Sequence, residues 1–384
     1  NAAGIAVKQV LTIADEEQDI LDAIDDSLSR CDVVLMTGGL GPTKDDITKY
    51  TLCKYFDTHL TLDHETLHRI EGFAEQRGMT LLEVHKMQAM VPEVCTVLPN
   101  LKGTACGMWF NKEGKVLVSM PGVPYEMRGL MTDQVIPKLK EQFPTQSIVH
   151  RTLLTIGRGE SRIAAQIERL EEEMSQKEIK VAYLPSAGMV KIRLTASGSQ
   201  ARVNVDTYFE MIKDELKDIT YGEGTDTLEK VVGELLLSRK AMLATAESCT
   251  GGFISQLMTK HSGSSSFFSG GIVAYANEVK VDSLGVQKEN IKKHGAVSEA
   301  VVIEMAQGAL NALHADYAVS TSGVAGPTGG SKFKPVGTVW IAVASEKGAL
   351  AKQFKFGNSR ARNIQLTAYS ALNFLRESIL QGKV

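Results

Sequence analysis

Apolar residues in the first 145 positions follow two alternating patterns. The short continuous apolar runs at 33–36 and 116–120 are typical of strands buried on both faces of a parallel sheet. Between residues 16 and 28 the apolar positions recur at helical spacing, which predicts an amphipathic helix. Residues 5–13 predict a further strand before it. This alternation of strands and helices predicts an α/β domain over residues 1–145.

Two further segments complete the predicted organisation. Residues 146–222 combine strand-like and helix-like stretches and predict a small α+β domain. Residues 223–384 predict a second α/β domain, which opens with a helix at 227–239 and closes with a helix at 359–380. Its strands are expected at 241–246, 271–275, 317–321, 337–345 and 351–356.

Length and composition are those of ordinary globular domains and exclude several classes of protein. The chain has 384 residues, and its net charge of −3 is not the basic excess that nucleic-acid binding requires. No apolar run reaches the length of a membrane span, no signal peptide is visible, and the five cysteines show no paired spacing. We therefore expect a cytoplasmic protein with neither membrane nor nucleic-acid partners. Residues 1–4 resemble a helix end with a glycine cap, which indicates missing sequence before them.

The segment 244–252 carries the most informative chemistry in the chain. It follows an apolar run and precedes a helical pattern, so it predicts a strand, a tight turn and the start of a helix. The first N–H groups of a helix have no intrahelical partner. The turn can therefore hold a nucleophile, Ser248 or Cys249, beside donors for an oxyanion, or it can cradle a phosphate.

A base for such a nucleophile is available at Lys280. The strand before it is expected to end at Tyr275, with Asn277 as the N-cap of the next helix and Lys280 in its first turn. The positive end of that helix disfavours the ammonium form, so a neutral lysine could serve as the base, with Tyr275 as relay. The alternative is a solvated helix lysine. The histidines of this region, His261, His294 and His314, carry no motif.

Other polar segments are expected near the same site. The glycine-rich loop 321–330 follows a strand, and hydroxyls gather at 263–266 before another. Arg360 and Arg362 begin the last helix and could bind a phosphate with forked donors. Taken singly, each glycine loop is more often a turn, but their placement after successive strands favours a site.

The N-terminal domain has its own glycine-rich loop, residues 37–46, directly after a predicted strand. Its glycines allow N–H groups to point at an anion. Asp45 and Asp46 could hold a divalent cation that polarises a pyrophosphate for attack by water. The alternative is a helix N-terminus with favourable acidic residues in its first turn.

The C-terminal motifs resemble those of the CinA family over 227–380. They are AESCTGG at 246–252, YANEVK at 275–280, HGAVS at 294–298, SGVAGPTGG at 322–330 and PVGTV at 335–339. The resemblance implies an α/β nicotinamide mononucleotide deamidase domain that needs no metal or other cofactor. It implies Ser248 as nucleophile and Lys280 as base, with Tyr275 also catalytic. The expected substrate-binding residues are Thr250, Gly251, Gly252, Ser265, Ser322, Gly323, Gly326 and Arg362.

The N-terminal loops resemble the molybdopterin-binding-like domain of the same family, which is related to MogA and MoaB. This implies a three-layer α/β domain, N-terminally truncated here, with an ADP-ribose pyrophosphatase that uses Mg, Mn or Co. The expected nucleotide-binding residues are Gly38, Gly39, Gly41, Thr43, Pro121, Gly122 and Pro124, with Asp45 and Asp46 on the metal. The alternative is nucleotide or molybdopterin binding without hydrolysis, or a competence-associated interaction protein.

The middle segment, 146–222, is similar to the small KH-like domain of the family. A KH domain that grips RNA needs a GXXG loop, and residues 157–160 read GRGE, so no RNA binding is expected. The resemblance also implies a homodimer.

Overall fold

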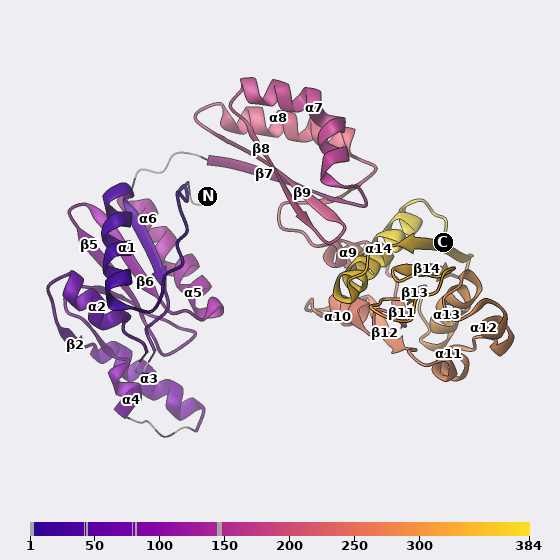
Figure 1. The fold of residues 1–384 in the computed structure, drawn as a ribbon, viewed down its shortest axis with the longest axis horizontal. Helices are drawn as coiled ribbons and strands as arrows, with labels where there is room; N and C mark the ends of the chain where they lie inside the picture. The colour runs from indigo at the N-terminus through magenta and orange to yellow at the C-terminus, as the bar shows by residue number, and fades with distance from the viewer. Residues whose placement is uncertain (1–3, 42, 44, 79, 81–82, 144–147) are drawn as a thin grey trace. The chain divides into compact units, whose positions relative to one another are not determined.

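The computed structural model describes residues 4–41, 43, 45–78, 80, 83–143 and 148–384. The chain forms two compact units, Asn1–Ile148 and Val149–Val384. Figure 1 labels the helices and strands of each unit, and the units are described separately below.

The first unit is built on a four-stranded sheet. In spatial order the strands are β1 (Val33–Thr37), β6 (Lys115–Met120), β5 (Gly107–Lys112) and β4 (Thr96–Leu98). β1 and β6 are parallel, as their apolar runs predict, whereas β5 and β4 add antiparallel strands. A smaller antiparallel pair consists of β2 (Leu60–Leu62) and β3 (Met90–Pro92).

Helices cover both faces of the four-stranded sheet, which confirms the three-layer α/β expectation. On one face lie α1 (Glu17–Arg30) and α2 (Thr48–Tyr55), and on the other α5 (Pro124–Leu130), a π-helical turn (Met131–Val135) and α6 (Ile136–Gln142). Alternate residues of β6 point to opposite layers: Leu117 packs toward α1, while Val116 and Val118 pack toward α6. The remaining helices are α3 (His64–Gln76) and α4 (Glu83–Met87).

The prediction of a strand at 5–13 is wrong. Residues 5–13 form no strand, and Val7 and Val10 are 69% and 84% exposed. A strand is stable only when its backbone groups pair with a neighbour, and none of the described segments pairs with this one. Of the predicted glycine-capped helix end, residues 1–3 lie outside the described part of the chain.

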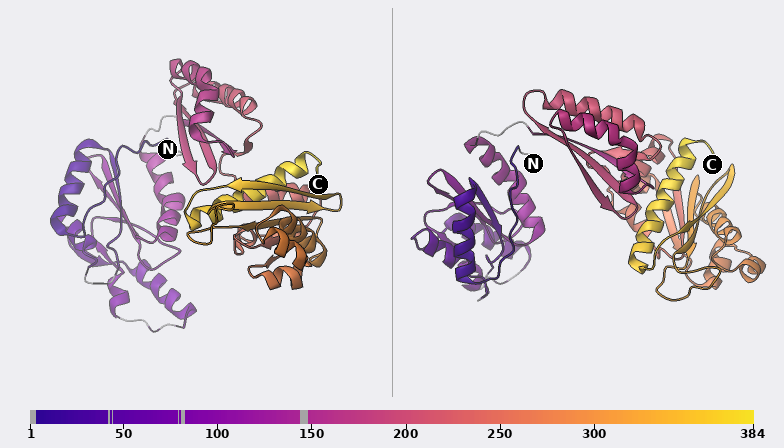
Figure 2. Two further views of the ribbon diagram at one scale, coloured as in Figure 1. Left: turned by 45° about the vertical axis from the view of Figure 1, so that its right-hand side comes forward. Right: turned by 45° about the horizontal axis from the view of Figure 1, so that its top comes forward.

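The second unit begins with a four-stranded antiparallel sheet. Its spatial order is β10 (Thr220–Glu223), β7 (Ile148–Ile156), β9 (Met189–Ser197) and β8 (Lys180–Ser186). Two helices, α7 (Glu160–Gln176) and α8 (Ala201–Glu215), lie side by side on one face, as Figures 1 and 2 show. Leu154, Ile156 and Tyr221 belong to the hydrophobic core of the segment that follows, so the small domain and the C-terminal domain share buried surface.

The C-terminal domain is a five-stranded sheet between two layers of helices. Its spatial order is β12 (Phe268–Val273), β11 (Leu243–Glu247), β13 (Tyr317–Gly323), β14 (Thr338–Ser345) and β15 (Gly348–Lys355). β12, β11 and β13 are parallel, and β14 and β15 are antiparallel. One layer comprises α9 (Leu228–Ser238), α10 (Phe253–Thr259) and α14 (Arg360–Leu380); the other comprises α11 (Asn277–Leu284), α12 (Lys288–His294) and α13 (Glu299–Ala312).

The carboxyl ends of β11, β12 and β13 meet at one edge of this sheet, because the three strands are parallel neighbours. The predicted chemistry lies at these ends, with Ser248 and Tyr275 after β11 and β12 and Ser322 in β13, one residue before its end at Gly323. The fold therefore brings together the loops that the sequence analysis singled out. No helix in the described part of the chain is long and apolar enough to cross a membrane.

Candidate active site

A buried carboxylate holds the turn after β11. Glu247, the last residue of the strand, is fully buried. It accepts the backbone N–H groups of Gly252 (3.1 Å), Ile254 (3.0 Å) and Ser255 (2.8 Å), and the Ser255 hydroxyl at 2.7 Å. These N–H groups are the free donors at the start of α10. Because the protein's own carboxylate uses them, they are not available to cradle a phosphate.

The turn places Ser248 against Lys280. The Lys280 Nζ lies 3.2 Å from Ser248 Oγ, and it also donates to the backbone oxygens of Ala274 (2.7 Å) and Tyr275 (3.1 Å). Lys280 is only 1% exposed, so it is not a solvated helix lysine. The Ser248 N–H donates to Thr321 O at 3.0 Å, which fixes the turn to β13.

Burial lowers the pKa of Lys280 below its ordinary value of 10.5, because desolvation disfavours the ammonium form. The predicted direction of this shift was right, but its main cause is burial rather than the helix end. The N-cap of α11 is Ala276, not Asn277, so Lys280 lies one position deeper in the helix than expected. A buried lysine beside a serine hydroxyl is the arrangement of a Ser–Lys hydrolytic site.

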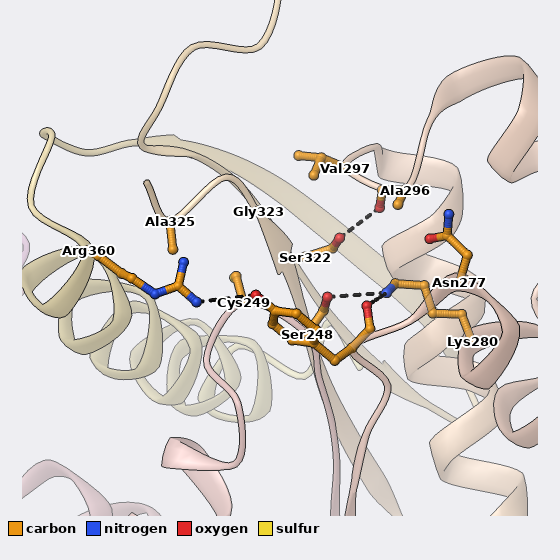
Figure 3. A pocket seen from close by; sticks show the side chains of 11 residues that line it. Ser248, Cys249, Asn277, Lys280, Ala296, Val297, Ser322, Gly323, Ala325 and Arg360 are labelled. Atoms are coloured by element: carbon orange, nitrogen blue, oxygen red, sulfur yellow. Dashed lines mark hydrogen bonds between the residues drawn. The ribbon is translucent and has the colours of Figure 1, made fainter. Parts of the chain in front are cut away.

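Ser248 and Lys280 lie in a cavity of about 200 Å³ at this edge of the sheet. Figure 3 shows the lining side chains converging from β13, α11, α14 and neighbouring loops, including the turn after β11. The lining residues are Ser248, Cys249, Tyr275, Asn277, Lys280, Ala296, Val297, Ser322, Gly323, Ala325 and Arg360. This set contains the guanidinium of Arg360 and no carboxylate, which favours an anionic ligand.

The guanidinium in the cavity is that of Arg360. Its Nη1 donates to Gly326 O at 2.9 Å and its Nη2 to the Tyr275 hydroxyl at 3.2 Å. Arg362, which we expected to bind the substrate, is exposed on the same helix and does not line the cavity. The Tyr275 hydroxyl is therefore bonded to Arg360 and not to Lys280 or Ser248.

Of the other predicted binding residues, only Ser322 and Gly323 line the cavity. The Ser322 hydroxyl donates to Ala296 O at 2.7 Å (Figure 3). A Cβ on Gly323 would lie 2.6 Å from the Val339 side chain, so packing against β14 already requires glycine there. Gly326 contributes its carbonyl to Arg360 rather than a surface of the cavity.

The remaining predicted residues of this domain are used elsewhere. Thr250 is buried, and its hydroxyl lies 2.8 Å from that of Thr321. The N–H of Gly251 donates to Ser248 O, and that of Gly252 to Glu247, so both glycines stabilise the turn. Ser265 is exposed in a short 3-10 helix and does not line the cavity.

Cys249 is unsuited to the nucleophile's role in this structure. Its thiol is buried, and burial raises the pKa to about 12, which leaves almost no thiolate at neutral pH. Its backbone N–H donates to no other residue within 148–384 and follows the serine directly. The position is that of an oxyanion donor beside a nucleophile on a strand-to-helix turn.

In the first unit, the loops after β1 and β6 lie against each other. The Gly38 N–H donates to Met120 O at 3.0 Å, and a Cβ on Gly122 would lie 3.4 Å from Gly38 Cα. Pro121 is buried, and Pro124 begins α5. Gly39 has a positive φ of 65°, and its Cβ position is filled by the Thr48 hydroxyl at 2.1 Å.

Asp45 and Asp46, the expected metal ligands, stay a prediction, and the described residues around them are used as follows. The Asp46 carboxylate accepts the N–H of Thr43 at 2.9 Å and also the Thr43 hydroxyl. Burial alone would raise the pKa of Asp46, but the hydrogen bonds from Thr43 and Gly41 lower it below its usual range. Among the described residues, no three histidine, cysteine or acidic side chains are arranged to hold an ion, so Asp45 has no such partners. Pro42 and Lys44 of the loop lie outside the described residues.

Comparison with known proteins agrees with this architecture. Three family models match the chain: the probable molybdopterin binding domain over 1–141, the damage-inducible protein CinA KH domain over 150–222, and the CinA C-terminal domain over 225–379. A CinA-like protein of Cytophaga hutchinsonii is 42% identical over 383 residues, covering 99% of this chain and 91% of its own. The chain belongs to the CinA family.

Other CinA relatives include a CinA-like protein of Flavobacterium psychrophilum, 43% identical over 99% of this chain and 92% of its own. Among solved structures, the competence/damage inducible protein CihA of Agrobacterium tumefaciens is 36% identical. The match covers 40% of this chain and 96% of the Agrobacterium tumefaciens chain, with a TM-score of 0.38. The names of these relatives refer to CinA or to a competence/damage inducible protein, and none of them specifies a reaction.

Within this CinA-family chain, sequence reasoning missed the role of Glu247 in holding the turn of the site. The usable signal was an acidic residue directly before a turn and a helix, where a carboxylate can accept free N–H groups. Ala296 and Val297 were also missed as lining residues, although they lie in the HGAVS motif. Both residues line the cavity with apolar surface, and such surface has no distinctive pattern in the sequence.

Proposed function

We propose that the C-terminal domain is an amidohydrolase that converts nicotinamide mononucleotide to nicotinate mononucleotide and ammonia. The observation that carries the proposal is the buried Lys280 Nζ, 3.2 Å from Ser248 Oγ. The cationic cavity around this pair supports a substrate that combines a carboxamide with a phosphate. The membership in the CinA family supports the same choice.

The proposed reaction has two halves. Neutral Lys280 takes the proton of the Ser248 hydroxyl while Oγ attacks the amide carbon. The tetrahedral intermediate then expels ammonia, which leaves with the proton from Lys280, and the acyl group remains on Ser248. A water molecule, deprotonated by Lys280, attacks this ester. The products are the carboxylic acid and free Ser248.

Two features of the turn support transition-state stabilisation. The Cys249 N–H, directly after the nucleophile, donates to no other residue within 148–384. It can receive the negative charge that develops on the amide oxygen. The carboxylate of Glu247 holds the turn rigid, so the donor does not need to reorganise during the reaction. The groups lining the cavity supply no set of metal ligands, and the proposed steps need none.

The test compares two adjacent substitutions. We expect Ser248→Ala to reduce ammonia release from nicotinamide mononucleotide by at least about 1,000-fold, because the nucleophile is lost. Cys249→Ala is the matched control and should retain most of the activity. The opposite result would transfer the nucleophile's role to Cys249. Activity in both variants would exclude covalent catalysis at this turn, and a wild-type protein that releases no ammonia would favour an interaction protein.

We also propose that the loops after β1 and β6 bind a nucleotide. The supporting observation is the contact between Gly38 and Gly122, which brings two glycine loops together at the carboxyl ends of parallel strands. The described residues do not assemble a metal site, so we propose no pyrophosphatase step.

Calorimetric titration with ADP-ribose tests this second site. We expect binding by the wild-type chain and weakened binding by Gly39→Val, whose Cβ would meet Thr48 at 2.1 Å and distort the loop. AMP formation that depends on added Mn²⁺ would show that hydrolysis occurs after all. The cytoplasmic location and the homodimer stay predictions.

A further inference from the structure

We propose that Tyr275 is a positioning residue that orients Arg360 toward the anionic end of the substrate, and that it is not the proton relay of the Ser–Lys pair. This inference rests on the proposed amidohydrolase function and assigns the part of the site that recognises the substrate's anion.

The first observation is that Tyr275 contacts Lys280 and Arg360 through different atoms. Its backbone oxygen accepts from Lys280 Nζ at 3.1 Å, while its hydroxyl accepts from Arg360 Nη2 at 3.2 Å. The side chain is 62% exposed, which places the ring at the mouth of the cavity rather than beside the buried lysine. The main chain of Tyr275 therefore belongs to the catalytic pair, and its side chain belongs to Arg360.

The second observation concerns the donors of Lys280. The neutral lysine amine that the proposed base requires has two N–H donors and one lone pair. The two backbone oxygens, Ala274 O and Tyr275 O, accept the N–H groups of Nζ, and the Ser248 hydroxyl lies against its lone pair. Both N–H groups and the lone pair of Nζ therefore have partners without the Tyr275 hydroxyl, and no hydrogen bond between described residues links that hydroxyl to Ser248 or Lys280.

The third observation is that Arg360 is held from two sides. Gly326 O accepts from Nη1 and the Tyr275 hydroxyl accepts from Nη2, so both ends of the planar guanidinium are fixed. The guanidinium has five N–H donors, and the remaining ones are available for an anion. Because the Tyr275 oxygen accepts from Arg360, its own O–H can donate to the same anion. Arg360 and Tyr275 thus form a two-part clamp for a phosphate.

Steady-state kinetics of Tyr275→Phe test the proposal. With nicotinamide mononucleotide we expect KM to rise about 5- to 10-fold, the effect of one lost hydrogen bond, with kcat changed less than about twofold. With nicotinamide riboside, which has no phosphate, kcat/KM should not change. The pH profile of kcat should be the same as in the wild type. In the Arg360→Gln background the substitution should add little, because Tyr275 acts through Arg360.

Tyr125→Phe is the matched control, since Tyr125 is similarly exposed (66%) and lies in the other unit. A relay role would instead lower kcat with both substrates and alter its pH profile, and that result would overturn the proposal. Should the wild type release no ammonia, the proposed function fails, but the clamp remains testable by titration with inorganic phosphate. Weaker phosphate binding in Tyr275→Phe and Arg360→Gln would then support it, and equal binding in all three would refute it.

Discussion

At the scale of a single residue, the proposed chemistry depends on the burial of Lys280. The side chain is 1% exposed, and the groups that contact its Nζ are neutral oxygens. No carboxylate among the cavity-lining residues compensates its charge, so the ammonium form is disfavoured and the pKa is lowered. A general base must be unprotonated, and a lowered pKa increases the fraction of the free base near neutral pH.

The pH dependence of the reaction follows from this shift. We expect kcat/KM to rise with pH as Lys280 loses its proton, with a midpoint below the ordinary lysine value of 10.5. The free energy of unfolding should also rise with pH. Between the lowered pKa and 10.5 the unfolded chain binds a proton at Lys280 and the folded chain does not, so the free energy of unfolding declines as pH falls through this window.

Measurement of ammonia release across pH, with denaturant titrations at the same pH values, checks both statements. Lys280→Arg is the control, because arginine keeps its proton throughout the range and should abolish the pH-dependent activity. A rate that falls as pH rises toward 10 would contradict the assignment of Lys280 as the base.

At the scale of elements, residue size decides how closely the two helix layers approach the C-terminal sheet. Toward α9 and α14 the strands present large side chains such as Ile341 and Val343, and toward α13 they present Ala342 and Ala344. Small residues allow α13 to lie near the sheet and its neighbour α11. The closest approach of α13 to α11 is at Gly308, where a Cβ would lie 2.0 Å from the backbone oxygen of Leu284.

Gly308→Ala tests this close packing. Alanine is the better helix former by about 1 kcal/mol, but here its methyl group would collide with backbone that cannot move freely. We expect a net loss of about 1–3 kcal/mol in the free energy of unfolding. Gly72→Ala in α3 is the control of opposite sign, because a Cβ there meets no atom within 4 Å. Denaturant unfolding of both variants decides the matter, and a stabilised Gly308→Ala would show that α11 and α13 are not so closely packed.

At the scale of the whole molecule, the hydrophobic core beneath the candidate site extends beyond the C-terminal domain into the small domain before it. All cavity-lining residues fall within 248–360. Leu154, Ile156 and Tyr221 of the preceding small domain nevertheless lie in the same hydrophobic core as Leu228 and Val232. Removal of the small domain would expose apolar surface that the intact unit buries.

Two fragments separate these contributions. The fragment 149–384 should release ammonia with the kcat of the full chain, because it contains the complete compact unit. The fragment 225–384 should keep the site residues but unfold at lower temperature, since three core side chains are missing. Thermal unfolding and ammonia release of both fragments test this. Equal stability of the two would show that the small domain adds nothing to the core.

Several features of this protein could be predicted from the sequence because they depend on local pattern. The apolar runs of β1 and β6 and the helical spacing of α1 are properties of neighbouring residues, and the structure confirms them. Ser248 and Lys280 could be proposed as a pair from sequence. Each follows a predicted strand, and the carboxyl ends of neighbouring parallel strands lie at the same edge of a sheet.

Only the tertiary structure decided which residues complete the site. Arg360 and Arg362 are equivalent in sequence, but two positions along a helix turn the side chain by roughly 200°, so only Arg360 reaches the cavity. The segment 5–13 has the pattern of a strand but no pairing partner among the described residues, and pairing is not encoded locally. The N–H groups after β11 look available in sequence, and only the folded chain shows that Glu247 occupies them. Local periodicity determined the elements, and long-range contacts determined what each polar group was free to do.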